Sequence, residues 1–240
     1  RPTTVQLPAM RLLPPFARVY LFCAVLVTGL NPAPSQACAN FKSKETSLDG
    51  SAKSVGKQHL VRQLQAAMKT DLYAKGAELA SRLESSTAFD DRNDYSVALM
   101  YLRRAPEAVK LLRQLEVERP GTYSVAANLG TALELSGNDT EALEWIREGV
   151  RRNPDSHDGT EWLHVKILEA KIANAKEPQF LQTHSVLGLK ADDLRDSIQV
   201  GGEAYPWQEV EEALLYQLKE RLQFVKPADP AVAALLYDFA

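Results

Sequence analysis

The sequence repeats itself with a period of 34 residues between about residue 89 and residue 156. The matched pairs are Tyr95 and Leu129, Ser96 and Gly130, Leu99 and Leu133, Glu107 and Glu141, Ala108 and Ala142, Leu112 and Ile146, Arg113 and Arg147, and Pro120 and Pro154. A period of this length is typical of a unit of two antiparallel helices, which buries its apolar side only by stacking on its neighbours. The repeat therefore predicts an all-α fold.

The residue types within each unit have physical reasons. Ala108 and Ala142 are expected where the second helix of a unit crosses the first, because a methyl group allows a close approach of two helices. Ser96 and Gly130 are their expected small partners on the first helix. Gly137 is expected just after a helix end, since glycine adopts the left-handed backbone conformation found there.

These residues resemble the tetratricopeptide repeat family. The matching motif is Asn128-Leu129-Gly130, Leu133, Gly137-Asn138, Ala142, Ile146 and Pro154 in unit 123–156, and unit 89–122 follows it less closely. Arg92 and Ala126 replace the family's tryptophan, and Gly149 replaces its usual alanine. The resemblance implies an α-solenoid of antiparallel helix pairs with a peptide-binding concave face.

Weaker units flank these two, so we predict an array over residues 58–174. Two helices, Leu60–Met68 and Leu72–Leu83, are expected to form a degenerate first pair. A fourth unit is expected to open with a capping box of Asp158 and Glu161, in which each side chain accepts a hydrogen bond from a backbone amide at the helix start. An insertion over 175–206 follows, with short extended segments at 185–189 and 197–200.

The C-terminal part, residues 207–240, is predicted to hold two helices. Apolar residues recur along one face of 207–224, as they do in a packed helix. The last helix is strongly apolar, whereas a solenoid normally closes with a polar-faced helix. We therefore expect that the chain continues in a longer form or that this helix docks onto a neighbour.

Residues 1–39 have the pattern of a secretory signal peptide. Arg11 and Arg18 precede an apolar run from Val19 to Leu30, which is followed by small residues. Met10 is the natural start, and an uncleaved membrane anchor is the alternative. Residues 40–57 are rich in Ser, Lys and Gly and are expected to form a flexible leader.

Cleavage is expected after Ala37 or after Ala39, and Cys38 is a weaker candidate for lipid attachment. We expect an exported protein, periplasmic or secreted, with no membrane span after cleavage. Removing residues 1–39 leaves 25 of the 28 basic residues and all 31 acidic residues, a formal charge of −6. Such a chain is a poor electrostatic match for nucleic acid.

One constellation has the composition of a metal site. His157, Glu161 and His164 are spaced four and three residues apart, and zinc binds such ligands. The order differs from that of zinc proteases, and no fourth ligand is evident. We expect structural roles, with His164 buried and hydrogen-bonded at a helix crossing, and we predict no cofactor and no catalytic residues. A zinc-dependent enzyme remains the less favoured alternative.

The resemblance also implies which side chains would line a concave binding face. These are Asp90, Asn93, Val97, Met100, Tyr101, Thr131, Glu134, Glu161, Val165 and Leu168. The face is apolar in its middle and acidic at its edges, which suits a segment with apolar anchors and basic residues. We therefore expect a non-enzymatic protein-interaction scaffold of the bacterial cell envelope. A subunit of a larger complex is the alternative.

Overall fold

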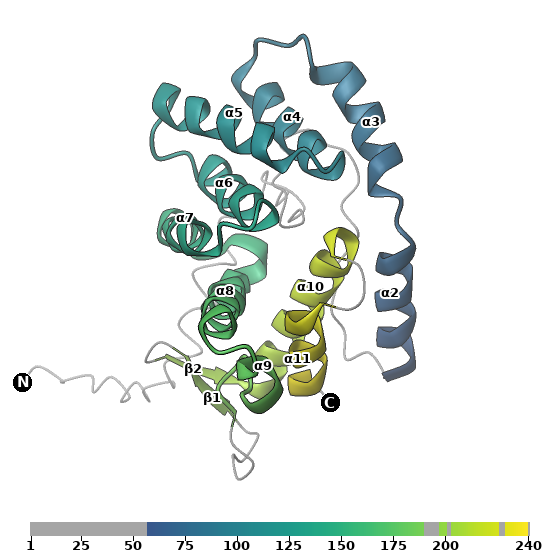
Figure 1. Cartoon of the computed structure of the whole chain (residues 1–240), viewed down its shortest axis with the longest axis vertical. Coiled ribbons are helices and arrows are strands. Elements are labelled where there is room, and N and C mark those ends of the chain that lie inside the picture. The colour runs from purple at the N-terminus through teal and green to yellow at the C-terminus, as the bar shows by residue number, and fades with distance from the viewer. Residues whose placement is uncertain (1–56, 190–196, 201–202, 226–228, 240) are drawn as a thin grey trace, which may run out of the picture. The chain divides into compact units, whose positions relative to one another are not determined.

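The computed structural model describes residues 57–189, 197–200, 203–225 and 229–239. All of them belong to one compact unit. This part of the chain is mostly helical, and its sheet is a single two-stranded hairpin (Figure 1). The predicted signal peptide, most of the leader and Cys38 lie outside the described residues.

Four helices in the middle of the chain match the two clear repeats. They are α4 (Phe89–Tyr101), α5 (Ala105–Glu118), α6 (Tyr123–Leu135) and α7 (Asp139–Arg152). Each packs against the next, and α7 packs against α8 (Glu161–Lys176). Their shared core includes Ala108, Leu112, Ala142 and Ile146, all completely buried.

The predicted helix crossing is present in α6 and α7. Gly130 faces Ile146 so closely that a methyl group at position 130 would lie 2.6 Å from the Cδ1 atom of Ile146. After α6 the chain turns through Gly137, which has a φ of 80°. The Asn138 side chain then caps α7 by accepting a hydrogen bond from the Glu141 amide. The local signals for these helices are therefore confirmed.

The first predicted pair is not a pair. Helices α2 (Lys57–Lys69) and α3 (Leu72–Leu83) form at the expected places, but α3 packs against α4 and α2 packs against α10 (Trp207–Phe224). Leu64 and Ala67 on α2 belong to the same core as the C-terminal helices. The expectation was wrong because local periodicity identifies a helix but not its distant neighbour.

The predicted capping box before α8 is also wrong. Residues Ser156–Gly159 form a 3₁₀ turn, η1, in which His157 and Asp158 both have positive φ values. Thr160 precedes the helix and makes no side-chain capping bond. The Glu161 carboxylate forms hydrogen bonds with two histidines instead of the backbone. A hydrogen bond between charged groups stabilises a buried carboxylate more than a bond from an amide does.

The insertion is partly ordered. It contains the short helix α9 (Phe180–Thr183) and an antiparallel hairpin of β1 (Ser197–Val200) and β2 (Glu203–Pro206). The extended segment predicted at 197–200 is confirmed, whereas residues 185–189 form a turn. Asp238 accepts a hydrogen bond from the Leu187 amide at 3.0 Å, which ties this turn to the last helix.

Two C-terminal helices complete the described chain, α10 and α11 (Pro230–Phe239). They share a core with α2, α8 and the hairpin, whose most buried members include Leu163, Ile167, Leu214, Leu218 and Leu235. In the part of the chain that the structure describes, no helix combines the length and apolarity needed to cross a membrane.

Candidate functional site

Most of the predicted concave face is buried. Of its ten residues, only Asp90 is exposed, and Val165 is half-buried. The others are Asn93, Val97, Met100, Tyr101, Thr131, Glu134, Glu161 and Leu168, each at most 9% exposed. Asn93 accepts a hydrogen bond from Asn128 of α6 at 3.2 Å, so it holds two helices together. In this conformation most of these side chains pack within the chain, whereas Met100 and Tyr101 also line an open pocket.

The chain itself supplies the groups that cover this face. On α10, the Arg221 guanidinium donates to Glu134 at 2.7 Å, and the Phe224 ring lies 5.4 Å from the Tyr101 ring, centroid to centroid. A basic residue and an apolar anchor are the chemistry that the sequence predicts for a partner of this face. Helix α10 therefore contacts two residues of the predicted face with the chemistry expected of that partner.

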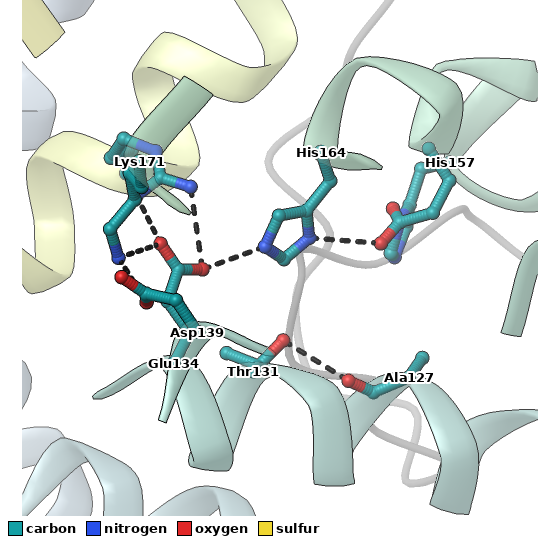
Figure 2. Close-up of polar contacts among 9 residues, drawn as sticks. Ala127, Thr131, Glu134, Asp139, His157, His164 and Lys171 are labelled. Atoms are coloured by element: carbon teal, nitrogen blue, oxygen red, sulfur yellow. Dashed lines mark hydrogen bonds and ion pairs between the residues drawn. The ribbon is translucent and has the colours of Figure 1, made fainter. Parts of the chain in front are cut away.

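A buried network of charges joins α6, α7, α8 and α10 (Figure 2). Its centre is the Glu134 carboxylate, which accepts from His164 Nε2 at 2.7 Å, from Lys171 Nζ at 2.8 Å and from Arg221. Lys171 also donates to Asp139 at the start of α7, at 2.7 Å. Each charged group is thus paired, as a buried charge must be.

The network continues to the start of α8. His164 Nδ1 lies 3.1 Å from Glu161 Oε1, and His157 Nδ1 lies 2.5 Å from Glu161 Oε2. The His157 ring stacks on Tyr216 of α10, with ring centroids 5.5 Å apart. The structure therefore brings the three candidates His157, Glu161 and His164 together, and it adds Glu134, which the sequence assigned to a different role.

These contacts change the acidity of the buried groups. Burial lowers the pKa of His164, but its hydrogen bonds to Glu134 and Glu161 outweigh this effect and raise the pKa to about 9. Burial opposes ionisation of Glu134, yet Arg221, His164 and Lys171 hold its pKa well below the usual value. The pKa of Glu161 is also depressed, since both histidines outweigh its burial. At neutral pH the network holds a charged imidazole between two carboxylates.

This network has the features of a structural element. The expected burial and hydrogen bonding of His164 are confirmed. Within the described residues, no group of three or more His, Cys, Asp or Glu side chains is arranged to hold a metal ion. The Glu161 carboxylate bridges the two histidines by hydrogen bonds.

An open pocket lies beside the covered face, where α2, α4 and α10 end and α3 begins. Its volume is about 320 Å³. Its apolar lining comes from Met68, Leu72, Tyr73, Met100, Tyr101 and Phe224, and its charged lining comes from Lys69, Asp71 and Arg103. Tyr73 is 62% exposed and Met68 41% exposed, so the apolar surface continues onto the rim.

Sequence reasoning found part of this pocket. Met100 and Tyr101 were predicted to contact a partner, and both line the pocket. Tyr73, Lys69 and Arg103 were missed, because they lie at the start of α3, at the end of α2 and in the turn after α4, outside the matched concave positions. One signal was available for Arg103: the 34-residue period pairs it with Gly137, and both have positive φ values, 59° and 80°.

Comparison with protein-family models, with curated proteins and with solved structures finds no match to this chain.

Proposed function

We propose that this protein is a non-enzymatic interaction module of the tetratricopeptide type, exported to the bacterial cell envelope, which binds a protein segment at the pocket beside α10. The repeat period, the successive packing of α4 to α8 and the N-terminal sequence pattern support the proposal. The observation that carries it is the apolar pocket lined by Met68, Tyr73, Met100, Tyr101 and Phe224. Met100 and Tyr101 are buried in its wall, and Met68 and Tyr73 are exposed on its rim.

The pocket has the composition of a protein-binding surface. Tyrosine and methionine are enriched at interfaces, because both offer large contact areas and methionine adapts to different shapes. A volume of about 320 Å³ is at the small end of ligand sites, enough for side chains of a bound segment. Since most of the predicted face is buried, a partner segment reaches the array here.

Affinity purification from the native host tests this function. The exposed residue Tyr73 is changed to Ser, and Val117→Ser is the matched control, because Val117 is 82% exposed on α5 and does not line the pocket. Loss of a large aromatic contact at the pocket rim is expected to reduce the amount of co-purified partner about tenfold. The control is expected to behave like the unchanged protein. Equal recovery with both variants would refute binding at the pocket.

A second candidate function is an assembly subunit that docks through α11. Leu236 and Tyr237, adjacent on this helix, are 41% and 82% exposed, which is unusual for large apolar side chains. Under this function, Tyr237→Ser abolishes incorporation into a larger complex, whereas Tyr73→Ser does not. Sedimentation of complexes from the native host, carrying either variant, separates the two functions.

A further inference from the structure

We infer that the segment recognised by the pocket is acidic, with an apolar side chain as its anchor, and that Lys69 and Arg103 bind its carboxylates. This inference rests on the proposed function and specifies its partner. It differs from the sequence-based expectation of a basic partner, because the acidic edges of the array are already neutralised within the chain.

The first observation is the state of the acidic groups. Glu134 and Glu161, which made the predicted face acidic, are buried and paired with Arg221, Lys171 and two histidines. Their carboxylates are therefore not available to bind a basic partner. The sign of the accessible charge at this end of the array is therefore set by the exposed side chains around the pocket, at the end of α2 and in the turn after α4.

The second observation is that two pocket cations have no partner. Within the residues that the structure describes, neither Lys69 nor Arg103 forms an ion pair or a side-chain hydrogen bond, and both are exposed. Most arginines on the repeats are paired, for example Arg113 with Glu141 and Arg147 with Glu169. An unpaired cation beside an apolar wall is available for an acidic ligand.

The remaining polar groups at the pocket are engaged. The Asp71 carboxylate caps α3 by accepting from the Ala74 amide at 3.0 Å. The end of α4 carries partial negative charge, but the Leu99 and Met100 carbonyls accept bonds from the Arg104 and Arg103 amides. The two free cations therefore determine which charge on a partner is favoured.

The third observation concerns the backbone at Arg103. This residue has a φ of 59°, in the left-handed region that Gly137 occupies one period later. An arginine is strained there, whereas a glycine is not. A strained residue suggests a use for its side chain, and the Arg103 side chain lies on the pocket with Met100 and Tyr101.

Fluorescence anisotropy with defined peptides tests the inference on the purified chain. The probe is a labelled ten-residue peptide with Leu and Phe flanked by Asp and Glu. One comparison peptide replaces every acid by Lys, and a second replaces Leu and Phe by Ser. We expect the acidic–apolar peptide to bind at low salt with a micromolar Kd, and each comparison peptide to bind at least about tenfold more weakly.

Two variants test the residues. Lys69→Glu and Arg103→Gly are each expected to raise the Kd of the acidic–apolar peptide about fivefold to tenfold. Lys110→Glu is the matched control, because Lys110 is also exposed and forms no ion pair within the described residues, but it lies outside the pocket. Arg103→Gly removes backbone strain, so its melting temperature should not fall. A loss of binding therefore cannot come from unfolding.

The outcomes separate the inference from the proposed function. Tighter binding of the Lys peptide, or no binding of the acidic one, overturns the acidic partner. So does an unchanged Kd in both variants. The proposed function survives any of these results if Tyr73→Ser still reduces partner recovery from the host. If Tyr73→Ser has no effect, the proposed function fails too.

Discussion

The contact between Arg221 and Glu134 decides whether α10 covers the face of the repeats in solution. We predict that Arg221→Met, which keeps a similar apolar stem, destabilises the protein. The Arg221 side chain is 7% exposed, and its guanidinium donates to Glu134 at 2.7 Å. Breaking a buried ion pair costs about 3–5 kcal/mol when the remaining charge is left alone. Glu134 keeps Lys171 and His164, so we expect about 2–3 kcal/mol.

The double variant isolates the contact. Glu134→Gln alone leaves Arg221 buried without its carboxylate, and the combination of both changes removes both charges together. We therefore expect the two effects to be non-additive, with a coupling free energy of about 2 kcal/mol. Urea unfolding followed by circular dichroism, with all four proteins at pH 6, measures the cycle.

A matched surface pair serves as the control. Arg104 and Glu107 form a two-bond ion pair between side chains that are 43% and 56% exposed. Changing Arg104→Met and Glu107→Gln in the same cycle should give no coupling beyond error, since exposed pairs are screened. Additive effects of the Arg221 and Glu134 changes, within about 0.5 kcal/mol, would refute the placement of α10 against α6.

Three further predictions concern the fold and the network. Gly130→Ala should destabilise the protein by about 1–3 kcal/mol, because the new methyl group meets Ile146 at 2.6 Å. Gly149→Ala, whose new methyl group has its nearest atom at 3.6 Å, should stabilise the protein by about 0.5–1 kcal/mol. Urea unfolding compares the two variants. The pKa of His164 is raised from 6.5 to about 9, so its contribution to the free energy of unfolding is complete below pH 6.5 and disappears as pH rises through 9. The expected loss is about 3 kcal/mol. Urea unfolding across this pH range measures it, and a stability that does not change with pH would contradict it. Arg103→Gly should raise the melting temperature, because it relieves the left-handed backbone; a clear decrease in a thermal melt contradicts the strain.

The sequence is informative where structure is local. The 34-residue period identifies α4 to α7 because each helix packs against its immediate successor. Gly137 identifies a helix end, since few other residues take its backbone conformation easily. The crossing at Gly130 follows from the small side chains that a close approach needs.

The sequence fails where distant segments meet. Nothing local indicates that Arg221, 87 residues after Glu134, lies on its carboxylate. That one contact converts a predicted acidic binding face into a covered one, and Phe224 completes the cover at Tyr101. The pairing of α2 with α10 is missed for the same reason. Predicting the candidate site therefore required the packing of the C-terminal helices, which the period does not encode.

Photo-crosslinking in the native host tests the central claim, that the partner binds at the pocket and not along the covered face. A photoreactive amino acid replaces Tyr73 on the pocket rim in one protein and Asp90 in another. Asp90 is the one exposed residue of the predicted concave face and lies at the opposite end of α4 from the pocket. We predict that position 73 crosslinks a partner protein and that position 90 does not. A crosslink at position 90 without one at position 73 would contradict the account.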